Sequence, residues 1–222
     1  MEIAMSLKNW DEMIRNNLAQ IKIPKSVTLV AVSKRKPVKS IRVAYKYGVR
    51  DFGENYLQDA IPKIQALQDL PDIRWHYIGH IQSNKIKEIV KYFDMVQSVD
   101  RKKVLLKMQN TCEMQEKTLR ILIQINIGKE PQKSGIFPEN LAEFLQECEH
   151  YSRLEVQGLM GIPPVNCDPR PYFEEMHKLF QQYKTEFGLT TLSMGMSHDY
   201  QLAVESGATM VRIGTSIFGP RD

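Results

Sequence analysis

The run Leu119-Arg120-Ile121-Leu122-Ile123-Gln124-Ile125-Asn126-Ile127 is the clearest structural signal in this 222-residue sequence. It is apolar, rich in β-branched side chains and bounded by polar residues, which is typical of a strand that is buried on both faces. Shorter runs of the same kind recur along the chain, at residues 27–32, 49–52, 73–78, 95–99, 155–160, 191–194 and 209–213. The sequence therefore predicts eight strands.

Stretches with helical periodicity lie between these runs, with apolar side chains at about every third or fourth position. They cover residues 38–47, 84–92, 101–115 and 172–187, a helix opened by Pro138-Glu139-Asn140, and a helix at 5–19 before the first strand. Alternating strands and helices predict parallel strands with right-handed crossovers. Since no linker rich in Pro, Gly or Ser divides the chain, we expect a single α/β domain over residues 1–222, a (β/α)8 TIM-type barrel. A doubly wound open sheet is the alternative.

Composition and charge are those of an ordinary globular chain, with 42% hydrophobic and 25% charged residues and a formal net charge of +4. The cysteines Cys112, Cys148 and Cys167 are far apart and form no CxxC pair, so we expect no metal site, no disulfide framework and a cytoplasmic location. No run approaches the roughly 20 apolar residues of a membrane helix. Basic and aromatic residues are not interleaved as in a nucleic-acid surface, so neither membrane nor nucleic acid is an expected partner.

The ends of the last two strands carry small residues that suit an anion. In a parallel barrel, functional groups gather at the carboxyl ends of the strands. The loops there supply Ser197 and then Gly214 and Thr215, whose backbone N–H groups and hydroxyls can approach a phosphate closely. The alternative is that Gly214 and Thr215 only turn the chain.

Lys34 directly follows the first strand and is expected to point into the mouth of the barrel, with Arg35 and Lys36 close by in sequence. Burial and neighbouring positive charge both lower the pKa of a lysine, and Schiff-base formation requires the neutral amine. Opposite a phosphate site, such a lysine suggests an aldehyde that also carries phosphate, such as pyridoxal 5′-phosphate (PLP). The alternative is a solvated lysine at a strand end.

Arg212 lies within the apolar run at residues 210–213, where a guanidinium needs a partner. It either pairs with an acid or donates to a pyridine nitrogen, which would then stay unprotonated and make the ring a poorer electron sink. His76 and His80 flank Gly79 at a strand end and lack the helical geometry of a metal pair, so we interpret them as lining the pocket. The motifs HExxH, GxxxxGK[ST], GxGxxG and GxSxG do not occur.

Longer motifs follow one another from the first strand onward, at residues 31–37, 52–56, 76–85, 133–135, 158–160, 192–197 and 212–219. On these motifs the sequence resembles the pyridoxal-phosphate homeostasis proteins, PLP-binding proteins of fold type III whose barrel is like the N-terminal domain of alanine racemase. The implied cofactor residues are Lys34 as the Schiff-base lysine, Ser197, Gly214 and Thr215 around the phosphate, Arg212 at the pyridine nitrogen, and Asn55 and Met194 along the pocket. Lys36, His76 and Lys133 are secondary, Lys133 because it matches a family lysine with a role in further PLP handling. Arg35 departs from the threonine usual in the family, which adds charge beside Lys34 but removes no ligand.

The resemblance implies a non-catalytic carrier or regulator in PLP and amino-acid homeostasis, with apo PLP-dependent enzymes as candidate acceptors. The sequence ends at Asp222, directly after the last motif, so we expect no second domain carrying the catalytic tyrosine of alanine racemases, and no efficient racemisation. A monomer is expected. A small PLP-dependent amino-acid racemase is the alternative function, and an RNA-binding module, which the balanced charge disfavours, is a third.

Overall fold

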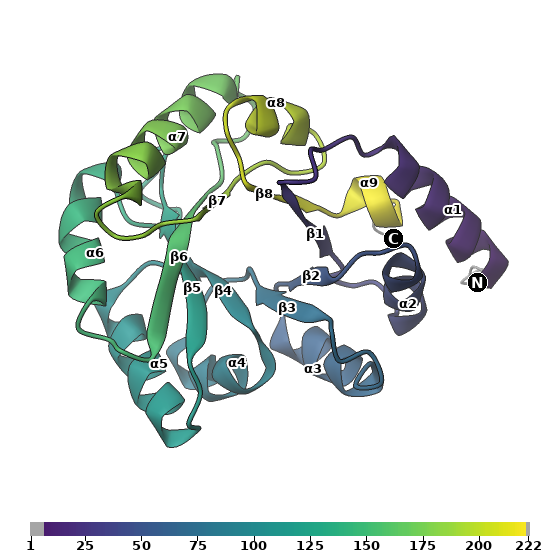
Figure 1. Ribbon diagram of the computed structural model, residues 1–222, viewed down its shortest axis with the longest axis horizontal. Coiled ribbons are helices and arrows are strands. Elements are labelled where there is room, and N and C mark those ends of the chain that lie inside the picture. Colours follow the sequence, from purple (N-terminus) through teal and green to yellow (C-terminus); the bar gives the residue numbers. More distant parts are fainter. Residues whose placement is uncertain (1–6, 221–222) are drawn as a thin grey trace.

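The eight apolar runs form eight parallel strands, which close into one barrel in the computed structural model of residues 7–220 (Figure 1). The strands are β1 (Thr28–Val32), β2 (Asp51–Glu54), β3 (Arg74–Tyr77), β4 (Met95–Val99), β5 (Leu119–Ile125), β6 (Leu154–Gly161), β7 (Thr191–Ser193) and β8 (Met210–Ile213). They pair in chain order, and β8 pairs in turn with β1. The predicted (β/α)8 barrel is therefore confirmed, and the doubly wound alternative is wrong.

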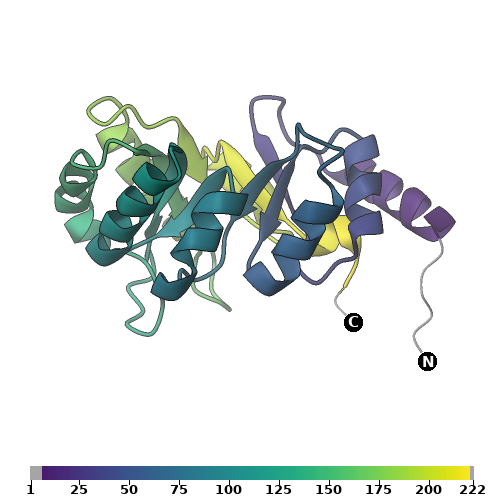
Figure 2. The same cartoon turned by 90° about the horizontal axis from the view of Figure 1, so that it is seen from below.

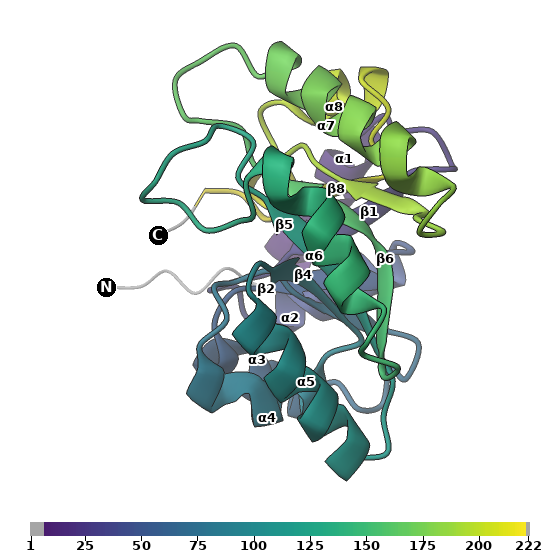
Figure 3. The same cartoon turned by 90° about the vertical axis from the view of Figure 1, so that its left-hand side faces the viewer.

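Helices surround the barrel, as the views in Figures 2 and 3 make plain. They are α1 (Leu7–Gln20), α2 (Val38–Lys46), α3 (Leu57–Ala66), α4 (Ile86–Tyr92), α5 (Lys102–Met114), α6 (Leu141–Cys148), α7 (Arg170–Lys184), α8 (Tyr200–Glu205) and α9 (Thr215–Phe218). Single 3₁₀ turns, Ser83–Lys85 and Pro138–Asn140, precede α4 and α6. None of the helices within residues 7–220 is long and apolar enough to cross a membrane.

The helices expected from the sequence are present, and three others were not expected. The first helix is observed from Leu7, and residues 5 and 6 of the expected range lie outside the described part of the chain. The α3 helix contains Pro62, which interrupts a helical sequence pattern because proline lacks a backbone donor. The α8 and α9 helices have only 6 and 4 residues, too few to show a helical period.

Side chains alternate between the inside and the outside of the barrel, and this alternation sets the direction of the functional groups. The inside holds a small apolar cluster with members from five strands: Val30, Met95, Leu122, Met160 and Met210. The large core lies outside, between strands and helices, and contains Ala31. Because Val30 faces inward and Ala31 outward, the same alternation carries Lys34 to the inner face at the end of β1.

The N-terminal helix lies against the last helix of the chain. The α1 helix packs on α2 and α9, with Trp10 and Ile14 buried and the Asn17 side-chain amide donating to the Ile217 carbonyl at 2.9 Å. Figure 2 shows the described ends of the chain on this same side of the barrel. The α9 helix starts at Thr215, so α1 supports one of the segments in which a phosphate site is predicted.

Candidate functional site

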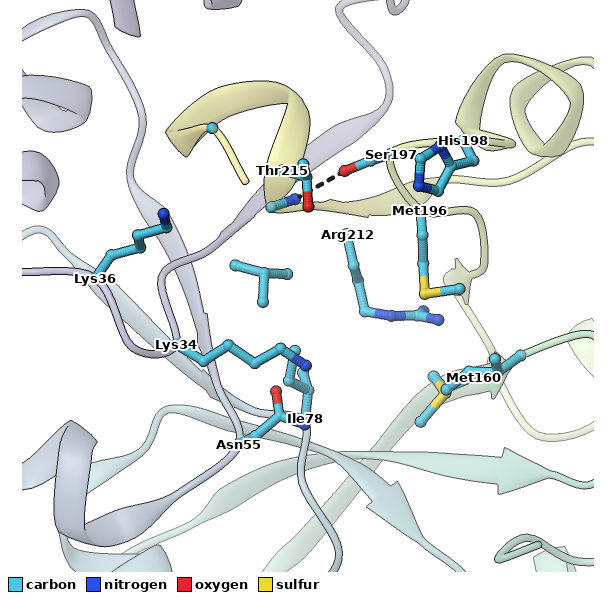
Figure 4. A pocket seen from close by; sticks show the side chains of 14 residues that line it. Lys34, Lys36, Asn55, Ile78, Met160, Met196, Ser197, His198, Arg212 and Thr215 are labelled. Atoms are coloured by element: carbon cyan, nitrogen blue, oxygen red, sulfur yellow. Dashed lines mark hydrogen bonds between the residues drawn. The ribbon is translucent and has the colours of Figure 1, made fainter. Parts of the chain in front are cut away.

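A cavity of about 270 Å³ opens at the carboxyl ends of the strands (Figure 4). The predicted residues along its wall are Lys34, Lys36, Asn55, Ser197, Arg212, Gly214 and Thr215. They come from the ends of β1, β2, β7 and β8, which meet at one end of the barrel because all the strands are parallel. Residues far apart in sequence are thus brought to one small space.

Lys34 and Arg212 enter this space from adjacent strands. Arg212 is the register partner of Val30 on β1, so Lys34 lies four residues farther towards the mouth than the level of Arg212. Figure 4 shows the half-buried Lys34 side chain extending through the cavity towards Asn55 and Ile78. The amine therefore lies inside the pocket rather than on the rim.

The turn that carries Lys34 is held from the outer side of the barrel by a buried cation. Lys63 Nζ donates to the Ser33 carbonyl at 2.8 Å, to Glu54 Oε1 at 2.9 Å and to Asp59 Oδ2 at 2.7 Å. The Asp59 carboxylate also accepts the backbone N–H of Arg35 at 2.6 Å, and Arg35 has a left-handed φ of 61°. Burial raises the pKa of the Glu54 carboxyl despite the nearby Lys63 charge. Ser33 and Arg35, the residues on either side of Lys34, are therefore both held by hydrogen bonds to side chains of α3.

Arg212 is buried, with 4% of its surface exposed. Its guanidinium donates to Ser193 Oγ at 2.6 Å and to the Gly161 carbonyl at 3.0 Å. Burial lowers the pKa of Arg212 to about 10, against the opposing effect of the Asp199 charge, so the group stays cationic at neutral pH. No salt bridge to a carboxylate holds it within residues 7–220. Its partners are a hydroxyl and a carbonyl, and donor capacity remains for a ligand.

The loops after β7 and β8 meet at Ser197. Its Oγ accepts the backbone N–H of Gly214 at 3.2 Å and that of Ser216 at 3.3 Å, and the first of these bonds is drawn in Figure 4. The turn out of β7 requires Gly195, because its φ is 90° and a Cβ there would lie 2.5 Å from that of Ala203. Converging backbone donors and a hydroxyl form a pattern that suits an anion.

Three of the predicted residues lie elsewhere. Met194 is fully buried in the outer core, because it follows the inward-facing Ser193 and so points out of the barrel. His76 faces inward but lies deeper, where it contacts Asp51 and Gln97. Lys133 lies in the loop after β5 and pairs with Glu130 at 2.5 Å. Met194 and His76, which were expected to line the pocket, are therefore not among its wall residues, and Lys133, for which the resemblance implies a role in further PLP handling, also lies away from the cavity wall.

His80, also expected to line the pocket, is exposed and lies 3.2 Å from Ser134 Oγ. The residues that the sequence interpretation missed include Ile78, Met160, Ile162, Met196 and His198, all of which line the cavity. The alternation of side chains along a strand predicts two of them, because Ile78 lies two residues after His76 and Ile162 lies two residues after Met160. No such alternation points to His198, because it lies in a loop.

The groups around the cavity match the chemical features of PLP. The amine of Lys34 lies on one side, the donors of Gly214 and Thr215 on another, and Ile78 and Met160 supply apolar wall. The buried Oδ1 of Asn55 has no hydrogen-bond partner within the described chain, so the site offers an acceptor for a ligand hydroxyl. These groups fit a small phosphorylated aromatic aldehyde. No cluster of His, Cys, Asp and Glu in residues 7–220 could hold a metal ion.

Fold and pocket together define a barrel of the alanine racemase class. The family model described as alanine racemase, N-terminal domain, matches residues 11–222. The barrel superposes on the alanine racemase of Clostridium difficile with a TM-score of 0.78, over 95% of this chain and 57% of that chain. At 15% sequence identity, this likeness shows the fold alone.

More similar proteins define the family. The chain is 42% identical to the pyridoxal phosphate homeostasis protein of Pasteurella multocida, over 100% of this chain and 99% of that protein. It is 39% identical to the protein of the same name in Escherichia coli, over 94% of this chain and 97% of that protein. PipY of Synechococcus elongatus, solved with PLP bound, superposes with a TM-score of 0.85 at 35% identity, over 95% of this chain and 100% of that chain. The chain belongs to the pyridoxal phosphate homeostasis protein family.

Proposed function

We propose that this chain binds PLP as a Schiff base on Lys34 and acts as a non-catalytic carrier or regulator in PLP and amino-acid homeostasis. The observation that carries the proposal is the cavity whose wall brings Lys34 together with Ser197, Gly214 and Thr215. The PLP-bound structure of PipY, a relative at 35% identity, supports the choice of ligand.

Lys34 is the nucleophile in this proposal. PLP, when bound, supplies an aldehyde that condenses with an amine and releases one water molecule. Ile78 and Met160 limit the water around the Lys34 amine, and Arg212 adds positive charge to the same pocket. Desolvation and positive charge both favour the neutral amine that attacks a carbonyl.

The phosphate is assigned to the loops after β7 and β8. The backbone N–H groups of Gly214 and Ser216 already converge on Ser197 Oγ, at 3.2 and 3.3 Å. A phosphate oxygen is a stronger acceptor than a hydroxyl, since hydrogen bonds to charged groups are shorter and stronger. We therefore expect these donors, with the Thr215 hydroxyl, to turn towards a bound phosphate.

Arg212 and the composition of the pocket favour a carrier over a racemase. A guanidinium only donates, so a ring nitrogen next to it is held unprotonated, which weakens electron withdrawal by the ring. A racemase also needs an acid and a base on opposite faces of the substrate carbon. In the described part of the chain, the residues lining the cavity include His198 but neither a tyrosine nor a carboxylate.

Transfer of PLP to apo enzymes is the proposed use of the bound cofactor. Ile162 and Met196 line the cavity, yet 37% and 39% of their surfaces are exposed. The mouth therefore presents apolar surface on which a second protein can dock while the pocket opens. A cytoplasmic monomer with a single domain completes the proposal.

Titration of the purified chain with PLP tests the function. We expect a visible absorbance band to form in the wild type and in Lys39→Ala, an exposed lysine on α2, but not in Lys34→Ala. Incubation with single amino-acid enantiomers should leave their chirality unchanged. A visible band that persists in Lys34→Ala would overturn the binding mode, and turnover that requires Lys34 would make the chain a racemase.

A further inference from the structure

A continuous chain of hydrogen bonds runs along the inside of the barrel, from Arg212 to the opposite opening. Arg212 Nη1 lies 2.6 Å from Ser193 Oγ, and Ser193 Oγ lies 2.7 Å from Gln97 Oε1. Gln97 Nε2 lies 2.9 Å from His76 Nδ1, and His76 Nε2 lies 3.0 Å from Asp51 Oδ1. All five side chains are buried, with at most 6% of each residue exposed.

The two ends of this chain determine the direction of every hydrogen bond in it. Arg212 can only donate, so Ser193 Oγ accepts from it and uses its one proton to donate to Gln97 Oε1. The amide nitrogen of Gln97 then faces His76 and donates to Nδ1. His76 therefore carries its proton on Nε2 and donates it to Asp51.

Each hydrogen bond in this chain depends on its neighbours, because the side chains around it are apolar. The chain passes through the inner apolar cluster that includes Met95, Leu122 and Met210, and the Gln97 amide also lies 3.3 Å from Met210 Sδ. A buried polar group that loses its partner is costly because no water replaces that partner. The loss of one hydroxyl within the chain should therefore reorient its neighbours on both sides.

The far end of the chain is anchored by charge at the amino-terminal opening of the barrel. Arg74 donates to both oxygens of Asp51, at 2.7 and 2.5 Å. Burial by itself would raise the pKa of the Asp51 carboxyl, but the hydrogen bonds from His76 and Arg74 hold that pKa below its usual value. The other charged groups that line the small cavity there are Asp94 and Arg120. An ionised Asp51 thus fixes the acceptor end of the chain.

We propose that Ser193, Gln97 and His76 are positioning residues, which hold the Arg212 guanidinium in the orientation that meets the ligand ring. The proposal rests on the proposed function for the identity of that ligand. None of the three is a wall residue of the ligand cavity, so they act through Arg212. One structural consequence needs no ligand: the hydroxyl of Ser193 fixes the orientation of the Gln97 amide, and so decides whether Nδ1 of His76, two links away, faces a donor or an acceptor.

Nitrogen-15 NMR of histidine in the PLP-free protein tests this consequence. We expect the wild-type His76 signals to be those of the neutral Nε2–H tautomer. In Ser193→Ala the Gln97 amide loses the donor that fixes it and can rotate, which places Oε1 against His76 Nδ1. Because Asp51 still accepts from Nε2–H, we expect signals of a protonated Nδ1 to appear beside those of Nε2–H. The matched control is Ser40→Ala, a buried serine on α2 whose hydroxyl donates to the Pro37 carbonyl, and it should leave His76 unchanged. Unchanged His76 signals in Ser193→Ala would overturn the proposal.

A second variant covers the case in which Ser193→Ala does not fold. Gln97→Met keeps the approximate size of the side chain but breaks the chain, and it should weaken PLP binding about threefold to tenfold by freeing Arg212. Gln109→Met, at a buried glutamine on α5, should bind PLP as the wild type does. Equal PLP affinity in Gln97→Met and the wild type would contradict the positioning role. Failure of the wild type to bind PLP would instead refute the proposed function and leave the His76 readout intact.

Discussion

Gly79 lies against the backbone of Asn55 so closely that a Cβ atom at Gly79 would come within 2.1 Å of the Asn55 carbonyl oxygen. Gly79 follows β3 and Asn55 follows β2, so this contact sets how the ends of two neighbouring strands sit at the mouth of the cavity. Any side chain at Gly79 must displace the segment that presents Asn55 to the cavity.

Gly79→Ala should therefore weaken both folding and binding. We expect a loss of at least about 1–3 kcal/mol in the free energy of unfolding, as for overpacked sites, and a measurable loss of PLP affinity. Gly188→Ala is the control, because its φ of 63° makes alanine unfavourable while nothing lies within 4 Å of the added atom. It should cost stability of about 1–2 kcal/mol without changing PLP affinity. Urea unfolding and PLP titration measure the two effects, and unchanged affinity in Gly79→Ala would refute the contact's role.

Thr215→Val should discriminate between PLP and its unphosphorylated analogue. The loss of one hydrogen bond to a charged oxygen costs about 1.5–3 kcal/mol, or roughly tenfold to a hundredfold in affinity. Because Thr215 lines the part of the cavity to which we assign the phosphate, we expect this loss for PLP and little change for pyridoxal. Binding titrations with both ligands make the comparison. Equal weakening of the two ligands would rule out a phosphate role for Thr215.

The ring nitrogen of bound PLP should be unprotonated near neutral pH, because Arg212 can donate to it but cannot accept from it. Nitrogen-15 NMR with ring-labelled PLP measures this state directly. Arg212→Glu replaces the donor with an acceptor and should shift the nitrogen towards the protonated form. A protonated ring nitrogen in the wild type would show that Arg212 does not act on the ring and has only a structural role.

The strands could be predicted from the sequence because they are buried on both faces and therefore read as nearly continuous apolar runs. The α3 helix could not, since Pro62 interrupts its pattern. The position of Lys34 in the cavity follows from the sequence because Lys34 continues the inward alternation of β1, whereas Met194 is one residue out of phase with the inward positions of β7.

How deep inside the barrel a side chain lies is a second feature that could not be predicted from the sequence. His76 points inward as expected of a pocket residue, but it lies one layer below Ile78, which reaches the cavity. The partnership of Ser193 with Arg212 joins residues on two strands, and only the register of the closed sheet brings them together.

The stability of the fold should depend on Asp51 in acid. Its pKa is lower in the folded chain than its ordinary value of 3.8, so its ionised form stabilises the fold above that value, and the stabilisation is lost as pH falls through the folded pKa. Between about pH 5 and about pH 3, the free energy of unfolding should fall more steeply in the wild type than in Asp51→Asn. Asp168→Asn, at an exposed loop residue, should follow the wild type. Identical pH profiles for wild type and Asp51→Asn would contradict the assignment.

Borohydride reduction of the PLP-loaded protein, followed by peptide mass spectrometry, tests the central claim most directly. Reduction of the carbon–nitrogen double bond fixes the pyridoxyl group on the lysine that holds it. Lys34, Lys36 and Lys133 are the lysines to compare, since Lys36 also lines the cavity and Lys133 lies in the loop after β5. We predict that the pyridoxyl mass is found on Lys34. Its presence mainly on Lys36 or Lys133, or its absence from all lysines of a protein that binds PLP, would contradict the claim that Lys34 forms the Schiff base.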